Sequence, residues 1–282
     1  MTLLEQQIRG LTEDLSAVVS KLSDEATPKR VHRLRVTIRR IESLVSYANP
    51  DLGKKMERSL EKLESLRKRA GKVRDIDVQK KLLDRVGNGS TAKDRKSLTA
   101  LLDKKRERQA TRLQSAIKKV AESKFLSRME RIAEKIAEGP SSQNRPLAPL
   151  GEARLQLARM ADDFSVRQSL KPNRLHEARI QLKKVRYLAE LAEESPERKA
   201  FVDDLKKVQD AAGEWHDWQE LAGLAEKRFG DRVNCALLRE IRALFAARQS
   251  AAISAANRLF TSQTERKPPR SVQHARSFAR PA

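Results

Sequence analysis

The amino-acid sequence predicts an all-α protein made of two helical bundles related by internal pseudo-twofold duplication. Apolar residues recur at steps of three and four along most of its 282 residues, which is the spacing of one helix face. The chain has only 10 Gly, 10 Pro and 4% aromatic residues. β-Sandwiches and barrels need more turn, aromatic and β-branched residues, so this composition disfavours both. Two sequence blocks also occur in the same order in each half of the chain.

Five helices are expected in the first half. An apolar stripe from Leu3 to Leu22 predicts the first. The second is expected to begin near Pro28, because proline is tolerated in a first helical turn. It should end by Asn49, because Pro50 pushes the preceding residue out of the α region. Further helices are expected over 51–70, 73–86 and about 91–138, with breaks at Gly71 and at residues 87–90.

Five more helices are expected after a linker. Residues 139–147, rich in Gly, Pro and Ser, separate a first bundle over 1–138 from a second over 148–261. The second bundle is expected to contain helices over about 148–168, 172–193, 197–212, 214–229 and 232–261. Residues 262–282 have no apolar stripe and are expected to form a disordered basic tail.

The repeat consists of two aligned blocks. Residues 31–48 align without a gap with 175–192, and residues 67–78 align with 209–220. The identical pairs are His32/His176, Arg35/Arg179, Leu44/Leu188, Ala48/Ala192, Ala70/Ala212, Gly71/Gly213 and Asp75/Asp217. The histidine and the glycine are 39 residues apart in the first half and 37 apart in the second. Equal order and nearly equal spacing indicate a duplication.

The charge of the chain indicates a polyanionic partner. Its 60 Lys and Arg against 38 Asp and Glu give a net charge of +22. Cys235 is the only cysteine, which excludes a disulfide scaffold. The sequence has no apolar run of roughly 18 residues and no signal-peptide pattern at its start. We therefore expect a soluble cytoplasmic protein without a membrane partner.

The repeated helix is expected to carry a basic stripe beside its apolar one. His32, Arg35 and Arg39 lie within about 60° of one another on a helix, apart from Leu34 and Ile38. The second half repeats this stripe with His176, Arg179 and Lys183, and Lys184 and Arg186 add charge at its edges. Residues 29–41 contain six Lys or Arg and no acid, so few partners are available within the helix. An anion-binding surface is therefore favoured over an ordinary solvated face.

Several residues have two interpretations. The helical histidines either pack through hydrogen bonds or contact an anion, and no spacing typical of metal ligands accompanies them. The basic residues at 67–69 either end a helix capped by Gly71 or extend the anion-binding surface. Trp215 and Trp218 are expected in the core rather than on a stacking platform.

These motifs resemble the CHAD domain, the conserved histidine α-helical domain. The resemblance depends on the His-x-x-Arg-x-x-x-Arg-Arg motif at 32–40 and on VRDIDV at 73–78. In the second half it depends on LHxxRxxxKKVRY at 175–187 and GEWHD at 213–217. The resemblance implies two helical bundles about a pseudo-twofold axis, a central basic groove or pore, and binding of inorganic polyphosphate at polyphosphate granules. Lys183 and Lys184 replace the arginine pair of the first half, which keeps charge but loses bidentate geometry.

We therefore expect non-catalytic binding of polyphosphate, with no cofactor and no metal. The expected contacts are His32, Arg35, Arg39, Arg40, Arg74, His176, Arg179, Lys183, Lys184, Arg186 and His216. The alternative is a nucleic-acid-binding or architectural protein that uses the same basic surface, and weak nucleic-acid binding through charge is possible in either case. An enzyme acting on polyphosphate is less favoured, because the sequence has no P-loop, no acidic metal cluster and no nucleophile motif.

Overall fold

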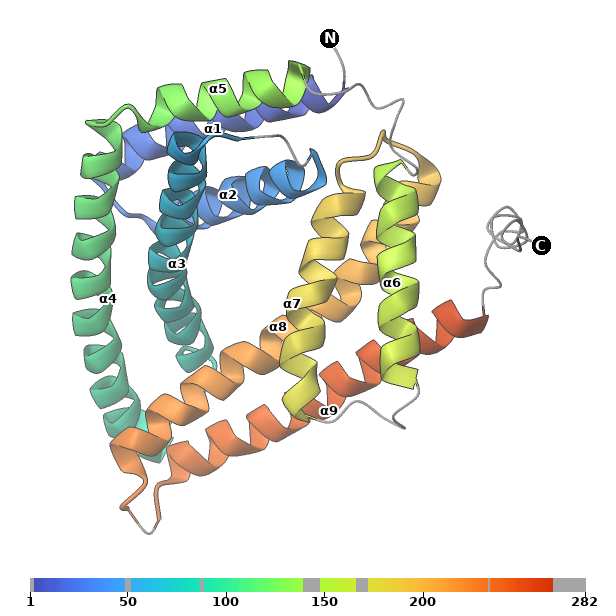
Figure 1. The fold of residues 1–282 in the computed structure, drawn as a ribbon. Helices are drawn as coiled ribbons and strands as arrows, with labels where there is room; N and C mark the ends of the chain where they lie inside the picture. Colours follow the sequence, from blue (N-terminus) through green and yellow to red (C-terminus); the bar gives the residue numbers. More distant parts are fainter. Residues whose placement is uncertain are drawn as a thin grey trace.

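The computed structural model describes residues 3–48, 52–86, 89–138, 148–165, 172–232 and 234–265, and within these ranges the chain is helical without strands (Figure 1). The first half forms α1 (Leu3–Asp24), α2 (Pro28–Ala48), α3 (Lys54–Leu83), α4 (Ala92–Ala121) and α5 (Phe125–Glu138), with a short 3₁₀ turn at Gly89–Thr91. The second half forms α6 (Pro149–Ser165), α7 (Pro172–Ala189), α8 (Pro196–Phe229) and α9 (Ala236–Glu265). The all-helical class is confirmed.

The first two helices follow the sequence pattern closely. The α1 stripe is buried at Ile8 and Leu15, and it packs against α2, α4 and α5. In α2 the predicted apolar residues Leu34 and Ile38 are fully buried, and Val45 at the end of the same side is partly buried. Burial of that side turns the basic stripe of α2 away from the core of its own bundle. Trp215 and Trp218 are also buried, as expected.

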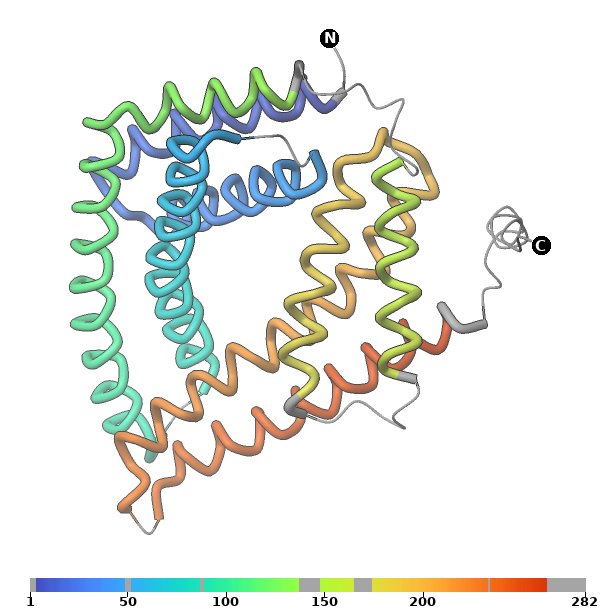
Figure 2. The backbone as a smooth tube through the Cα atoms, viewed as in Figure 1, coloured from blue at the N-terminus to red at the C-terminus, as the bar shows by residue number. Residues whose placement is uncertain are grey.

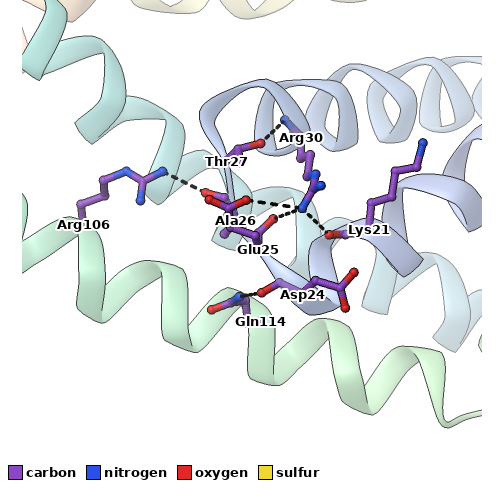
Figure 3. Close-up of polar contacts among 8 residues, drawn as sticks. All are labelled: Lys21, Asp24, Glu25, Ala26, Thr27, Arg30, Arg106 and Gln114. Atoms are coloured by element: carbon purple, nitrogen blue, oxygen red, sulfur yellow. Dashed lines mark hydrogen bonds and ion pairs between the residues drawn. The ribbon is translucent and has the colours of Figure 1, made fainter.

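The turn between α1 and α2 is fastened to α4, which fixes where α2 begins (Figure 3). Arg106 Nη2 donates to the Ala26 carbonyl at 2.9 Å, and Gln114 Nε2 donates to the Asp24 carbonyl at 3.2 Å. Arg30 Nη1, in the first turn of α2, donates to the Lys21 carbonyl at 2.9 Å. These bonds satisfy three carbonyls around the end of α1, where the chain reverses direction.

The predicted helix ends at Gly71 and Gly213 are wrong, because α3 and α8 continue through both glycines. Ala70 and Val73 are fully buried on either side of Gly71, so the apolar stripe crosses the glycine without interruption. A glycine inside a helix costs about 1 kcal/mol relative to alanine, which the burial of such a stripe outweighs. The predicted helices 51–70 and 73–86 are therefore one helix, as are 197–212 and 214–229.

Other predicted boundaries also differ. The expected helix over 91–138 is divided into α4 and α5 by a turn at residues 122–124, which lets Phe125 and Met129 enter the core beside α1. α7 ends at Ala189 rather than near 193, and α9 runs from Ala236 to Glu265 rather than over 232–261. Residues 262–265 are therefore helical and not part of a tail. The predicted linker and the rest of the predicted tail lie outside the described residues.

The two halves meet along two seams, where α2 contacts α7 and α3 contacts α8 (Figure 2). Away from α2 and α7, the C-terminal part of α3 and the N-terminal part of α4 share an apolar cluster with α8 and α9. Ile76 and Leu98 from the first half and Trp218 and Ile241 from the second are all buried in this shared cluster. Arg232 Nη1 also pairs with Asp94 Oδ1 at 2.6 Å across the same junction. Within the described part of the chain, no helix combines the length and hydropathy needed to cross a bilayer.

Candidate anion-binding pocket

A pocket of about 770 Å³ lies where α2 and α7 meet, and we call it the central pocket. Its lining residues are Arg39, Glu42, Ser43, Ser46, Tyr47, Arg67, Glu152, Gln156, His176, Arg179, Ile180, Lys183, Lys184, Tyr187 and Leu188. Five of these are Lys or Arg and two are Glu, so cations dominate the wall. Of the predicted contacts, Arg39, His176, Arg179, Lys183 and Lys184 line the pocket directly.

The cations of the central pocket have few acidic partners. Arg39, Arg179 and Lys183 are partly buried, and none of them forms an ion pair within 4.0 Å among the described residues. Arg179 Nε is fully buried and has no hydrogen-bond partner there. A buried donor without a partner costs roughly 1–3 kcal/mol, and more when the group is charged. The pocket therefore concentrates partly buried positive charge at an electrostatic cost.

The pKa values of these cations are lowered for the same electrostatic reason. Burial, followed by the charges of Arg179, Arg39 and Arg35, lowers the pKa of Lys183 to about 6. Burial also lowers the pKa of Arg39 and that of Arg179 from their ordinary values, and neighbouring arginine charges add to the effect. Charges on α2 therefore act directly on groups of α7, and the two basic stripes meet.

In the first half, the stripe of α2 is anchored to α3. Arg35 Nη1 donates to Asp75 Oδ1 at 3.0 Å and to the Gly71 carbonyl at 3.3 Å. His32 is exposed and does not line the pocket; partial desolvation, then the charge of Arg74, lowers its pKa. Arg74 thus lies close to His32 but outside the pocket wall. The predicted contact His32 therefore lies outside the pocket wall, near Arg74 of α3.

In the second half, two histidines lie together. The rings of His176 on α7 and His216 on α8 have centroids 5.4 Å apart. Burial, then the charge of Arg179, lowers the pKa of His216 to about 4, so the ring is neutral at pH 7. Burial raises the pKa of the neighbouring Asp217 carboxyl to about 6, against the opposing charge of Arg179. Asp217 therefore lies in the cluster with Arg179 and Lys183.

Three of the basic residues near the pocket are already paired. Arg40 Nε and Arg186 Nε approach Glu190 at 3.5 Å and 3.7 Å, respectively. Arg67 Nε lies 2.8 Å from Glu42, and its Nη2 lies 3.3 Å from Glu64. Two predicted contacts, Arg40 and Arg186, are therefore held by one carboxylate, while Lys184 is exposed at the wall.

The sequence interpretation left Arg67 open as an extension of the anion-binding surface, did not include Tyr187 among the expected contacts and missed Glu42, although all three line the pocket. Tyr187 is buried, bonds to Arg39 and carries the Arg186 guanidinium 4.8 Å above its ring. Its position four residues after Lys183 was the available signal, because residues at that spacing share a helix face. Glu42 has no comparable signal, because it meets Arg67 from a different helix. Among the described residues, no group of three or more His, Cys, Asp or Glu could hold a metal ion.

The fold and the pocket define an all-helical protein whose two halves gather cations at one place. The chain belongs to the CHAD family: the model of the CHAD domain matches residues 3–226. The chain is similar to the crystal structure of the CHAD domain from the plant Ricinus communis, with TM-score 0.67, 18% identity, and coverage of 95% of this chain and 92% of that one. It is also similar to PptA from Streptomyces chartreusis, with TM-score 0.62, 16% identity, and coverage of 94% and 98%. At these identities the two structures establish the fold alone. No curated protein matches the chain.

Proposed function

We propose that this protein binds inorganic polyphosphate in the central pocket without chemical turnover, and that binding targets it to polyphosphate granules. The observation that carries the proposal is the meeting of Arg39, Arg179 and Lys183, cations from two helices, without acidic partners among the described residues. The duplication seen in the sequence supports the same interpretation, because two related basic stripes can flank one linear ligand. Membership of the CHAD family agrees with it.

Polyphosphate suits this arrangement chemically. It is a linear polymer with about one negative charge per phosphate and no bases to be read. Arg39 and Arg179 can each donate to phosphate oxygens, and Lys183 in the same wall adds an ammonium donor when it is protonated. In a pocket that is partly withdrawn from water, these charges interact more strongly than on an open surface. The anion would also supply the missing partner of Arg179 Nε.

Nucleic acid is the less favoured ligand. Proteins that bind single strands add aromatic side chains for base stacking, worth roughly 1–3 kcal/mol per base. None of the aromatic side chains that the structure describes is exposed. Of the two tyrosines in the pocket wall, Tyr187 is buried and covered by Arg186, and Tyr47 is half-buried. Base stacking therefore has at most one partly exposed tyrosine in the described part of the pocket wall.

The pocket is proposed to be non-catalytic. Hydrolysis of a phosphoanhydride needs an activated nucleophile and a group that stabilises the leaving oxygen. The candidate acid–base groups, His176 and His216, lie beside the cations, but no carboxylate hydrogen bond orients either ring among the bonds found in the described residues. Incubation with polyphosphate and divalent cations is therefore expected to release no phosphate above the level without protein.

The binding proposal is tested by neutralising the pocket. Arg39→Gln combined with Arg179→Gln removes two charges and keeps side chains of similar length. We expect the Kd for long-chain polyphosphate, measured by calorimetry at fixed salt, to rise about 100-fold, since each charged contact contributes roughly tenfold. Arg108→Gln combined with Arg112→Gln is the matched control, because both residues are exposed on α4 and away from the pocket.

The outcomes separate the possibilities. A large loss in the pocket variant with little change in the α4 control supports the site. Equal losses in both variants would show that net charge alone drives binding. Duplex or single-stranded DNA is added as a competitor at matched phosphate concentration, and displacement of polyphosphate by DNA would favour the nucleic-acid alternative. Circular dichroism confirms that each variant keeps its helical content.

A further inference from the structure

Two matching carboxylates behave differently beside the pocket cations. Asp75 on α3 and Asp217 on α8 occupy equivalent positions in the repeat. Asp75 is engaged by Arg35 at 3.0 Å, whereas Asp217 has no ion pair within 4.0 Å among the described residues. The charge of Asp217 nevertheless acts on both Arg179 and Lys183. The second half therefore holds an acid and a lysine in one cluster, and neither is paired.

We propose that Lys183 and Asp217 couple polyphosphate binding to proton uptake, so that the pocket binds its ligand more tightly in acid. This inference rests on the proposed function of the central pocket. Lys183 accepts a proton from solvent when phosphate arrives. Asp217 is an internal competitor of phosphate for Arg179 and Lys183, and protonation removes its charge. The only bonds formed are N–H and O–H bonds, and the same protons return to solvent when the ligand leaves.

The surroundings of Lys183 explain why it responds to an anion. Its charged neighbours are Arg179 on its own helix, Arg35 and Arg39 on α2, and Asp217 on α8. Further groups lie around it: His176 of α7 and Glu152 of α6 line the same pocket wall, His216 of α8 lies against His176, and Arg74 and Asp75 of α3 act on Asp217. Arg248 of α9 approaches Glu214 of α8 at 3.2 Å. The three arginines around the Lys183 amine outnumber the single carboxylate that acts on it, so in the empty pocket its proton is disfavoured.

The direction of the Lys183 effect follows from its pKa. Burial and the arginine charges lower that pKa to about 6, so the amine is mostly neutral at pH 7. Bound phosphate places negative charge beside the amine and raises its pKa again. Between these two pKa values, binding takes up a proton, and affinity falls as pH rises. Below about pH 6 the amine is already charged, and its contribution to the pH dependence ends.

Asp217 acts with the same sign. Burial raises the pKa of its carboxyl to about 6, so it is ionised at pH 7 and repels an incoming anion. Bound phosphate disfavours the carboxylate further and raises this pKa as well. Protonation on binding therefore also makes affinity fall as pH rises above about 6. The two groups together change the pocket by up to two positive charges over this range.

The experiment is calorimetric titration of the full chain with long-chain polyphosphate, in which terminal phosphates are a negligible share of the charge. It is run between about pH 5 and about pH 8 at constant ionic strength, in buffers of different ionisation enthalpy. We expect net proton uptake above about pH 6 and a rise in Kd of up to about tenfold per pH unit for each fully linked proton.

Two variants assign the protons. Lys183→Arg places a permanently charged group at the lysine position, so we expect less proton uptake and tighter binding near pH 8. Asp217→Asn removes the competing carboxylate, so we expect the same two changes through the other group. The double variant is expected to show a weaker pH dependence than the wild type. Lys227→Arg and Asp231→Asn, exposed near the end of α8, are the matched controls.

Failure of the inference and failure of the function give different results. Wild-type protein that binds polyphosphate with a constant Kd and no proton uptake across this range overturns the proton linkage but leaves the function intact. Absence of binding at every pH overturns the function itself. Unchanged pH dependence in the folded double variant shows that other groups carry the protons and also overturns the inference. The wild-type proton count remains decisive if a variant does not fold.

Discussion

The two halves place equivalent residues in different electrostatic settings. In the first half, Arg35 is held by Asp75 and by the Gly71 carbonyl. In the second half, the equivalent carboxylate Asp217 lies near Arg179, but the two form no ion pair within 4.0 Å. The Nε atom of Arg179 has no hydrogen-bond partner among the described residues. The first arginine is therefore a structural link between α2 and α3, and the second is available for a ligand. The two aligned sequence blocks thus contain one arginine held in an ion pair, Arg35, and one without an ion pair among the described residues, Arg179.

This difference shows that a partly buried cation can remain without an acidic partner, at a cost in stability. Pairing a charge stabilises the fold, while leaving it unpaired keeps affinity for an external anion. Lys183 is the extreme case, because its pKa is lowered to about 6. Its counterpart Arg39 lies close to Tyr187, which partly offsets the lowering of the Arg39 pKa.

The largest effect is expected when the charge of Lys183 is removed. Lys183→Met is expected to raise the free energy of unfolding by about 2 kcal/mol near pH 6, because a buried charge among like charges is replaced by an apolar group. The same change should weaken polyphosphate binding. Chemical denaturation and calorimetry on one preparation measure both effects.

The pH dependence of this gain has a definite sign. Because the pKa of Lys183 is about 6 in the folded protein and that of an ordinary lysine is far higher, the penalty of its charge is complete below about pH 6. It declines as pH rises from there toward the ordinary lysine pKa. The advantage of the Met variant should therefore shrink with rising pH, and a constant advantage would contradict the burial argument.

A second test compares the two arginines directly. Arg35→Gln removes an ion pair and a bond to a buried carbonyl, so we expect unfolding free energy to fall by about 1–2 kcal/mol. Arg179→Gln removes an unpaired group, so we expect little loss of stability and about tenfold weaker binding of polyphosphate. Equal stability losses in the two variants would show that the halves do not differ in this way.

The smallest expected effect concerns the two helix-interior glycines. Gly213→Ala is expected to stabilise the protein by about 0.5–1 kcal/mol, because alanine favours the helix and a Cβ there meets nothing within 4 Å. At Gly71 a Cβ would lie 3.7 Å from Arg35 Nη1, an ordinary contact, so Gly71→Ala should give a similar gain. Thermal unfolding measures both. A loss of stability in Gly71→Ala but not in Gly213→Ala would show that the added Cβ disturbs the bonds of Arg35 to Asp75 and to the Gly71 carbonyl.

The sequence predicted which faces are buried better than where helices end. The periodicity of α2 correctly identified the buried side that contains Leu34 and Ile38, since burial follows the helical period. It failed at Gly71 and Gly213, where the local preference of glycine for helix ends is overridden by apolar packing on both sides. It also missed the turn before Phe125, because a short turn between two amphipathic segments leaves the apolar pattern almost unbroken.

The repeated sequence blocks predicted several cations of the pocket wall, but they did not predict which basic residues form ion pairs. Arg39, Arg179 and Lys183 were recognisable because the same stripe occurs twice. The capture of Arg40 and Arg186 by Glu190 depends on where the chain leaves α7, which no helix-face argument describes. The separate settings of Asp75 and Asp217 likewise depend on contacts among four helices. Sequence patterns identify charged faces, but ion pairing across helices requires the packed structure.

The apolar cluster that α3 and α4 share with α8 and α9 also limits how this protein can be engineered. A truncated protein that contains only one half would expose the apolar residues around Trp218 or Ile76 to water. Such a protein would tend to aggregate. Both halves are needed to keep this apolar cluster out of water. A reporter protein should therefore be fused outside residues 3–265 and not inserted between the two halves.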